Sequence, residues 1–343
     1  MTLDRKVITS LSIQEIIDGL KEMHEPAFRA KQIAEWIYKK NVRSWDEMSN
    51  LSKDLRQKCA EKWIFCSTEE TDSVKSADGT EKLLLKLHDG ECIEMVIIPA
   101  GERVTFCLST QVGCPVGCLF CASGKNGLVR NLADHEIIGE FQLGCAKIGR
   151  LPDNIVFMGI GEGLLNFENL MSAVEKLTDE KFFGMGVRRL TISTSGFVPG
   201  MYKLAELGKE LNLAISLHAP DDEIRSRIIP GKLRYPIAEI MEAADVYREK
   251  CNRMPTLEYT LLKDINDSPA CAKSLSRIAR EHHTKVNLIP YNDTDSEFKR
   301  PAKNAIDTFE KILRNADVAV TVRQERGSDK AGACGQLRAE HMS

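Results

Sequence analysis

Three cysteines in one short loop are the residues of this sequence best placed to perform chemistry. Cys114, Cys118 and Cys121 follow a C-x-x-x-C-x-x-C spacing. Thiolates are soft ligands that select zinc, copper(I) or iron–sulfur clusters. Zinc would need a fourth ligand nearby, and the next histidine along the chain is His135. A four-iron cluster held by three cysteines would keep one iron open for catalysis. The spacing favours a [4Fe-4S] cluster, with zinc as the alternative.

Composition limits the classes of protein that remain. The chain has 343 residues, a net charge of −3 and 28% charged residues, which is ordinary for a soluble protein of about two domains. This charge does not by itself indicate a nucleic-acid partner. No apolar run reaches the ~20 residues of a membrane span, and no signal-peptide core follows the N-terminus. Eleven cysteines, an odd number, indicate metal or redox use in a reducing cytoplasm rather than a disulfide framework.

Two small units are predicted before the loop. Residues 1–65 read as a helical module, because Ser12-Ile-Gln-Glu15 is a capping-box pattern and apolar residues recur at helical spacing. Its basic residues are nearly balanced in number by acidic ones, so two interpretations of its surface remain: a solvated helix surface and an RNA-binding face. Residues 66–103 read as a β-hairpin extension with its turn at Asp89-Gly90.

Alternating strand and helix patterns follow over residues 104–325. The expected strands are 104–109, 154–159, 188–194, 212–217, 256–261 and 284–289, with a last one near 318–323. Such alternation predicts a parallel sheet with crossover helices. Polar residues gather after the strand ends, so we expect an α/β fold of the (β/α)6 partial TIM-barrel type, with a doubly wound sheet as the alternative. Residues 326–343 form a Gly-rich C-terminal tail.

Three sequence motifs resemble the RlmN/Cfr family of radical SAM RNA methyltransferases. They are Cys107-Leu-Ser-Thr-Gln-Val-Gly-Cys114, Gly127-Leu-Val-Arg-Asn-Leu132 and Ala333-Cys-Gly-Gln-Leu337, and the resemblance covers nearly the whole chain. It implies that Cys114, Cys118 and Cys121 hold a [4Fe-4S] cluster whose open iron binds S-adenosylmethionine (SAM). The segment around Glu25–Gln32 resembles the family's N-terminal accessory domain, which favours RNA contact by the helical module.

The resemblance also implies a set of SAM contacts at successive strand ends. Taken alone, each is weak, because glycines mark tight turns, hydroxyls cap helices and a lone histidine is more often structural. The implied contacts are Gly161, Glu162, Ser193, Ser216, Leu217, His218 and Asn292. This chain has Gly163 where the family usually has proline.

Three further residues are implied to act on the substrate. Glu94 lies in an apolar strand, where a carboxylate is more often an exposed edge residue, and Cys107 alone reads as a buried core thiol. Cys334 lies in a glycine-rich segment that suits an accessible thiol. By resemblance, Cys334 accepts a methyl group from SAM, Glu94 takes a proton from the adenine carbon, and Cys107 resolves the protein–RNA adduct through a disulfide with Cys334.

The implied substrate is an adenine of 23S ribosomal RNA, with transfer RNA as a second substrate. Methylation at adenine position 2 is favoured over position 8, the Cfr outcome. We also expect an electron donor protein such as a flavodoxin, no membrane contact, and a monomer. Another radical SAM reaction, such as methylthiolation, would want a second cysteine set that the sequence lacks. A non-catalytic, metal-dependent RNA-binding protein is the third alternative, and it would not need Glu94 or Cys334.

Overall fold

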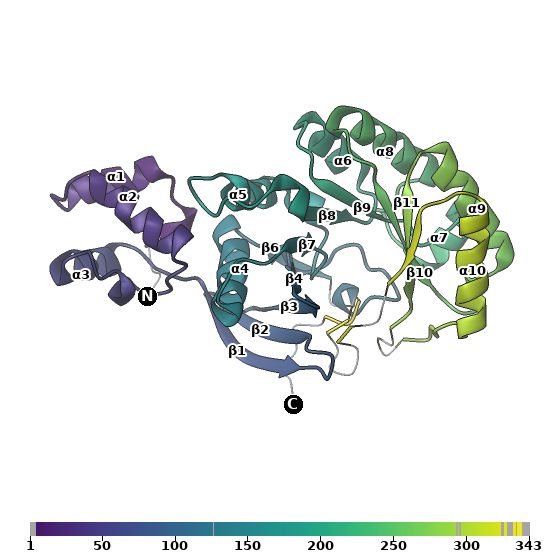
Figure 1. Ribbon diagram of the computed structural model, residues 1–343, viewed down its shortest axis with the longest axis horizontal. Helices are drawn as coiled ribbons and strands as arrows, with labels where there is room; N and C mark the ends of the chain where they lie inside the picture. The colour runs from purple at the N-terminus through teal and green to yellow at the C-terminus, as the bar shows by residue number, and fades with distance from the viewer. Residues whose placement is uncertain are drawn as a thin grey trace.

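The N-terminal residues form the expected helical module. The structure, a computed structural model, describes residues 5–125, 127–292, 294, 296–323, 326–327, 332–333 and 335–337. The module comprises η1 (Ile8–Ser10), α1 (Ile13–Glu22), α2 (Phe28–Ala34), the π-helical turn η2 (Glu35–Lys39), η3 (Trp45–Glu47) and α3 (Lys53–Lys62). The capping box is confirmed, since the Ser12 hydroxyl accepts from the Glu15 amide while the Glu15 carboxylate accepts from the Ser12 amide. Figure 1 shows the module beside the larger body.

Specific contacts attach this module to two helices of the larger body, α4 (Asp134–Ile148) and α5 (Phe167–Thr178). The Lys176 ammonium, on α5, donates to the Thr9 carbonyl and pairs with Asp134 at 2.7 Å. The Asn41 amide donates to the Gln142 carbonyl at 3.1 Å. The module is therefore joined to the helices that cover the first part of the sheet.

A single ten-stranded sheet organises the rest of the molecule. Its order is β1-β2-β3-β4-β7-β8-β9-β10-β11-β12. The first four strands are antiparallel: β1 (Thr68–Lys75), β2 (Glu81–Leu87), β3 (Cys92–Ala100) and β4 (Arg103–Cys107). The predicted hairpin is confirmed as β2–β3. Strand β1 was not predicted, because its sequence Thr-Glu-Glu-Thr-Asp-Ser-Val-Lys is almost wholly polar.

From β4 onward the neighbouring strands are parallel, and every predicted strand is present. They are β7 (Asn154–Phe157), β8 (Leu190–Thr194), β9 (Asn212–Ser216), β10 (Thr256–Leu261), β11 (Lys285–Pro290) and β12 (Val320–Val322). The strands follow one another in sequence order, whereas a doubly wound sheet reverses its order at a switch point. The open partial barrel is therefore confirmed and the doubly wound alternative is wrong. The predicted domain boundaries remain predictions.

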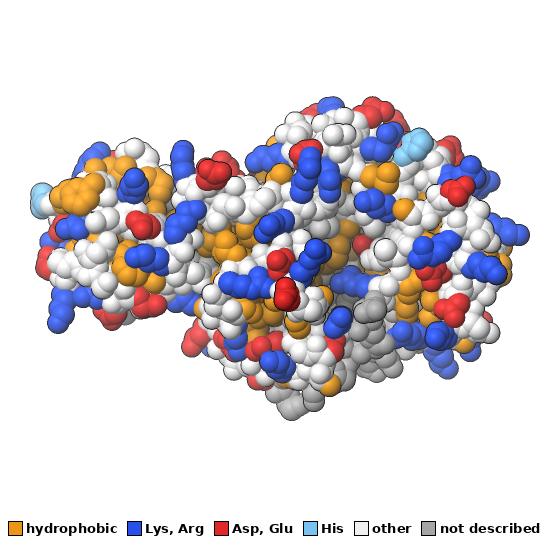
Figure 2. Space-filling model, in the orientation of Figure 1, with side chains coloured by type: hydrophobic (Ala, Val, Ile, Leu, Met, Phe, Trp, Pro, Cys, Tyr) orange, Lys and Arg blue, Asp and Glu red, His pale blue; other side chains and the backbone are white. Residues whose placement is uncertain are grey.

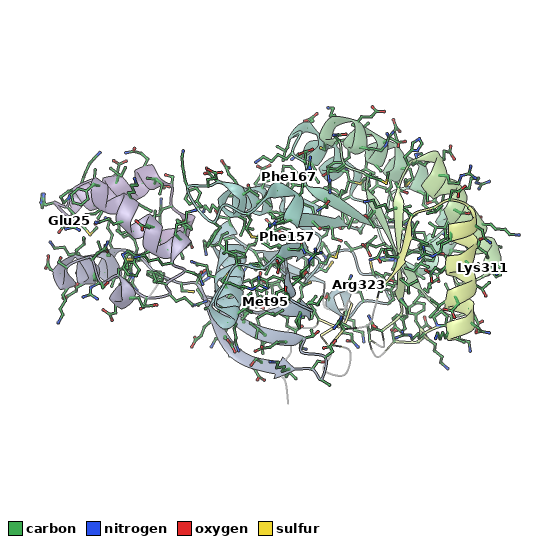
Figure 3. All side chains as sticks on the ribbon, in the orientation of Figure 1. Glu25, Met95, Phe157, Phe167, Lys311 and Arg323 are labelled. Carbon is green, nitrogen blue, oxygen red and sulfur yellow. The ribbon has the colours of Figure 1, made fainter. Side chains whose placement is uncertain are left out.

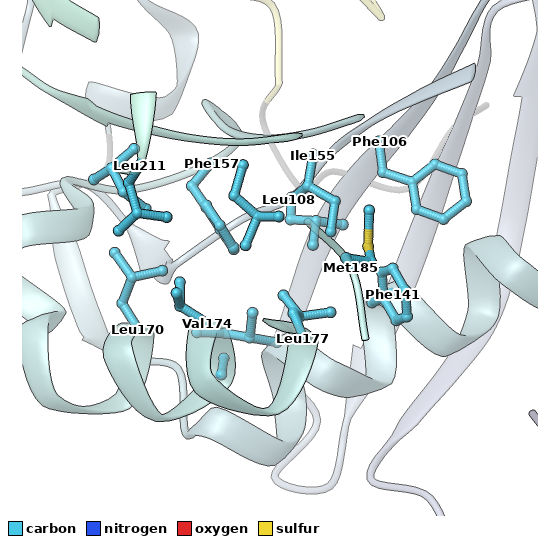
Figure 4. Packing of buried hydrophobic residues seen from close by; sticks show 14 of the residues in the cluster. Phe106, Leu108, Phe141, Ile155, Phe157, Leu170, Val174, Leu177, Met185 and Leu211 are labelled. Atoms are coloured by element: carbon cyan, nitrogen blue, oxygen red, sulfur yellow. The ribbon is translucent and has the colours of Figure 1, made fainter. Parts of the chain in front are cut away.

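Helices cover the outer surface of the parallel strands (Figure 1). Besides α4 and α5 they are η6 (Val187–Arg189), α6 (Val198–Glu206), α7 (Asp222–Ile228), α8 (Ile237–Cys251), α9 (Pro269–Glu281) and α10 (Lys303–Asn315). Figure 4 shows Leu170, Val174 and Leu177 of α5 facing Ile155 and Phe157 of β7. Burial of each such side chain stabilises the folded state by about 1.5–3 kcal/mol. This packing holds the strand ends in place.

A second sheet of two short strands, β5 (Gln111–Gly113) and β6 (Leu128–Asn131), closes the base of the cysteine loop. Sequence periodicity did not predict these strands, which are too short to show any. Within the described part of the chain, no helix has the length and apolar character that crossing a membrane requires.

Candidate active site

The cysteine loop is folded back on its own base. The Cys114 amide donates to the Gly127 carbonyl at 2.9 Å. Gly113 has φ +72°, and a Cβ there would collide with the same carbonyl, so only glycine fits. Leu119 donates to the Ile228 carbonyl at 3.0 Å, which ties the loop to α7. These contacts hold the loop over the carboxyl ends of the parallel strands.

The three predicted cluster ligands, Cys114, Cys118 and Cys121, line one cavity. Burial raises the pKa of the Cys114 thiol to about 12, and burial together with the other two cysteines raises the pKa of Cys118. Their thiolates therefore need a strong cation beside them. The described side chains include no set of three already closed around a single ion. Three buried thiols on one cavity suit a [4Fe-4S] cluster, which thiolates hold.

Glu162 extends the cavity at the end of β7. Its carboxylate accepts from the Ser195 amide at 2.6 Å and from the Leu164 amide at 3.2 Å, and burial raises its pKa. Gly161 has φ +115°, and a Cβ there would lie 2.7 Å from the Gln111 side chain. The turn therefore needs glycine at 161, and it presents a buried carboxylate beside the cysteines.

The structure brings together all but one of the predicted SAM contacts. Those that line the cavity are Gly161, Glu162, Ser193, Ser216, His218 and Asn292. Leu217 does not line the cavity, because its side chain is fully buried in the main hydrophobic core, while its amide donates to the Glu258 carbonyl.

His218 is a neutral side chain in this cavity. Burial and the nearby Arg225 lower its pKa to about 3. Its Nδ1 accepts a hydrogen bond from the Thr260 amide at 2.9 Å, which leaves Nε2 as the donor. The ring packs edge-on against Phe120 of the cysteine loop, with 4.9 Å between ring centroids. His218 can therefore donate a hydrogen bond to a ligand without adding charge.

Arg225 holds the backbone after the strand ends by hydrogen bonds. Its guanidinium is fully buried and donates to the carbonyls of Ser195, Leu217 and Tyr235. The carbonyls of Ser195 and Leu217 follow strands β8 and β9, whose ends carry the cavity residues Ser193 and Ser216. The sequence reasoning did not identify Arg225, because one arginine in an amphipathic helix carries no distinguishing signal.

Glu94 does not line the cavity, but it lies next to it. Only 1% of it is exposed, and its carboxylate pairs with Lys82 at 2.8 Å. Lys82 stands opposite Val96 in the β2–β3 register, on the sheet face that also carries Cys107. Val96 and Cys107 both line the cavity. The edge-residue interpretation of Glu94 is wrong, because both faces of this sheet are covered.

The C-terminal tail reaches the same cavity. Cys334 lies outside the described residues, but its neighbours Ala333 and Gly335 line the cavity, and Gly335 accepts from the Ala122 amide at 2.7 Å. Leu337 packs against Cys107, and no disulfide joins any two described cysteines. The expectation of a disulfide bond is therefore not supported.

Several cavity residues were missed from the sequence, among them Ser195, Glu258, Thr260 and Arg323. Figure 3 shows Arg323 just beyond the end of β12. Glu258 had a usable signal, namely a carboxylate within the apolar strand Thr-Leu-Glu-Tyr-Thr-Leu. Glu94 has the same signal, although the pattern alone favoured an exposed edge residue and the family resemblance implied its role.

The surface of the helical module is mixed in charge. Figure 2 shows Lys and Arg side chains interspersed with Asp and Glu over both the module and the larger body. Lys58 pairs with Glu25 and Asp54, and Lys62 pairs with Glu22. RNA binding by this module stays a prediction.

The chain is similar to known proteins over nearly its whole length. Residues 8–65 match the family model described as ribosomal RNA large subunit methyltransferase N-terminal domain, and residues 108–271 match the radical SAM superfamily. The chain is 44% identical to the probable dual-specificity RNA methyltransferase RlmN of Akkermansia muciniphila, covering 97% of this chain and 95% of that protein. It is 42% identical to the dual-specificity RNA methyltransferase RlmN of Geotalea uraniireducens, covering 98% and 97%.

A solved structure gives the same result for the fold. The crystal structure of a radical SAM methyltransferase from Sphaerobacter thermophilus superimposes with a TM-score of 0.94 at 40% identity, over 98% of this chain and 100% of that one. Since identity of this level extends over nearly the whole chain, the protein belongs to the RlmN family of radical SAM RNA methyltransferases.

Proposed function

We propose that this enzyme methylates position 2 of an adenine in 23S ribosomal RNA and, as a second substrate, in transfer RNA. The relatives' shared description as dual-specificity RNA methyltransferases supports two substrates. The observation that carries the proposal is the convergence of three cysteines, a buried glutamate and the neighbours of Cys334 on one cavity.

The residues present fit both cofactors of the radical SAM superfamily. Cys114, Cys118 and Cys121 would hold a [4Fe-4S] cluster. Glu162 would accept hydrogen bonds from the SAM ammonium group, with the close turn at Gly161 leaving room beside it. Serines 193 and 216, His218 and Asn292 would contact the rest of SAM. When bound, the two cofactors supply the methyl group and the one-electron chemistry that an unactivated aromatic carbon requires.

The chain's own residues carry the remaining steps. Cys334 would accept the methyl group, and the target base must leave its RNA stack to reach the cavity. Glu94, which is held by the ion pair with Lys82 beside the cavity, would take the proton from the adenine carbon. Cys107, which lies in the apolar group that also contains Leu337, would act in releasing the RNA from Cys334. We further propose a protein electron donor such as a flavodoxin, a monomeric enzyme and a cytoplasmic location.

A reconstitution experiment tests the proposal. Anaerobically purified protein, loaded with iron and sulfide, is incubated with SAM, reductant and unmodified 23S or transfer RNA. Digested RNA is then analysed by chromatography and mass spectrometry. We expect 2-methyladenosine from both RNAs, lost in Cys334→Ala and retained in the control Cys92→Ala, since Cys92 lies at the outer start of β3.

Other outcomes would change specific parts of the proposal. An 8-methyl product would replace position 2 by position 8. Cleavage of SAM with no RNA product would leave the enzyme class intact and show that the substrate is wrong. A cluster-loaded sample that never cleaves SAM would contradict the catalytic proposal as a whole.

A further inference from the structure

One layer inside the partial barrel is polar where such barrels are normally filled by branched apolar side chains. In the strand register, Ser216 of β9 stands beside Glu258 of β10, and Glu258 stands beside Asn287 of β11. Asn287 in turn pairs with Thr321 of β12. A buried carboxylate in such a layer is costly unless hydrogen bonds compensate it.

Glu258 is the centre of this polar layer. It is 6% exposed and lines the cavity, and burial raises its pKa. Its Oε2 accepts from the Asn287 amide at 2.8 Å, and Asn287 is itself oriented by the Thr321 hydroxyl, which donates to its Oδ1 at 2.9 Å. Among the described residues, this amide is the only hydrogen-bond donor to the carboxylate, so Oε1 remains available to a ligand.

The backbone of Glu258 is joined to the predicted SAM contacts. Its carbonyl accepts from the amides of Leu217 and His218 at 3.1 and 3.2 Å. Ser195, after β8, lines the same cavity, and its amide donates to the Glu162 carboxylate at 2.6 Å. Glu258 therefore shares one cavity with residues of three neighbouring strand ends.

The chemistry of this layer matches the sugar of a nucleoside. A carboxylate on a strand is a strong acceptor for ribose hydroxyls. Both cofactor and RNA contain ribose, and the position of Glu258 favours the cofactor. Glu162 follows β7 and lines the same cavity as Cys114 and Cys118, so it would hold the charged amino-acid end of SAM. A ligand that extends from β7 along the strand ends places its nucleoside at β9 and β10.

We propose that Glu258 binds the ribose hydroxyls of SAM and thereby fixes its nucleoside end. This assignment rests on the proposed function, because it requires SAM to occupy this cavity. It adds a residue of β10 to the contacts implied for β7, β8, β9 and β11.

Binding measurements without RNA test the assignment. Cluster-loaded enzyme is titrated anaerobically with SAM and with its 2′-deoxy and 3′-deoxy analogues, by calorimetry or equilibrium dialysis. Loss of a hydrogen bond to a charged group weakens binding about 10- to 100-fold. We expect Glu258→Gln to bind SAM about 10- to 100-fold more weakly than the unaltered enzyme does. The unaltered enzyme should bind at least one deoxy analogue more weakly than SAM by the same factor. Glu258→Gln should bind that analogue as well as the unaltered enzyme binds it.

Glu140→Gln is the matched control. Glu140 is also fully buried and burial raises its pKa well above the usual range, but it lies on α4 and does not line the cavity. We expect its SAM affinity to stay within threefold of the unaltered enzyme. Circular dichroism and the cluster's visible absorbance establish that each variant is folded and loaded.

The remaining outcomes overturn the assignment. If the unaltered enzyme binds both deoxy analogues as tightly as SAM, no ribose hydroxyl is recognised, and this result needs no variant. If Glu258→Gln keeps its SAM affinity but loses RNA affinity, the layer binds the RNA sugar instead. If the unaltered enzyme does not bind SAM at all, the proposed function itself is wrong. A loss of SAM affinity confined to Glu258→Gln would leave the proposed function intact.

Discussion

The buried pair of Lys82 and Glu94 makes a prediction that separates stability from chemistry. The two side chains are 7% and 1% exposed and lie 2.8 Å apart. Removing one partner leaves the other charge buried, whereas removing both leaves none. We therefore consider Lys82→Met, Glu94→Met and the double variant, because methionine fills a similar volume without charge.

The geometry sets the size of the effect. At 2.8 Å and an effective dielectric constant of about 20, Coulomb's law gives about 6 kcal/mol of attraction, much of which offsets the cost of removing both charges from water. We expect each single variant to lose about 3 kcal/mol of unfolding free energy, and the double variant only about 1 kcal/mol. The coupling between the two sites should therefore be about 5 kcal/mol.

Equilibrium urea unfolding of the iron-free proteins measures these energies. In parallel, the reconstituted variants are assayed for methyl transfer. We expect both variants without Glu94 to transfer methyl groups about 10²- to 10⁴-fold more slowly, as for loss of a general base, although the double variant is nearly as stable as the unaltered protein. Additive losses, within about 0.5 kcal/mol, would refute the ion-pair reasoning. A double variant with full activity would refute the role of Glu94.

Three further predictions follow from the supporting residues. The pKa of His218 falls from 6.5 in the unfolded chain to about 3 in the folded protein. As pH falls, His218 is therefore protonated in the unfolded chain but not in the folded protein. The free energy of unfolding should drop by about 2 kcal/mol between pH 6.5 and 5. His218→Gln should remove that part of the slope in urea unfolding. Gly163→Pro should raise stability by about 0.4–1 kcal/mol without weakening SAM binding, since position 163 begins a short helical turn and its φ is not positive. A loss of SAM affinity there would contradict this. Arg225→Met should lose at least about 3 kcal/mol in thermal or urea unfolding, and Arg225→Lys should not restore it, because an ammonium cannot reach three carbonyls at once.

The positions of the parallel strands could be predicted from the sequence for a physical reason. Strands covered on both faces need short continuous apolar runs, and Ile155–Phe157 of β7 and Leu213–Ile215 of β9 are such runs. Polar residues directly after these runs then had to gather at one edge of the sheet. Strand β1 lacks that signal, because its polar side chains alternate between half-buried and exposed positions.

Side-chain environment was harder to predict than strand position. The same pattern, a glutamate within an apolar strand, suits an exposed edge residue or a buried functional one. Glu94 is buried because α4 covers one face of its sheet and the barrel interior covers the other. This depends on Gly144, where a Cβ would lie 2.6 Å from the Phe106 ring, so that α4 packs closely on β4. Close packing between α4 and β4 cannot be predicted from the local sequence pattern of either element.

The two strand glutamates also differ in how they are compensated. Glu94 has a lysine partner at 2.8 Å. Glu258 has a neutral amide partner, and the Arg323 charge only partly offsets the effect of burial on its pKa. A fixed cation offsets the charge of a buried carboxylate, whereas a neutral amide only donates a hydrogen bond to it. Both side chains are buried, so the different partners, a lysine and an amide, are what separates the proposed proton acceptor Glu94 from the proposed ligand contact Glu258.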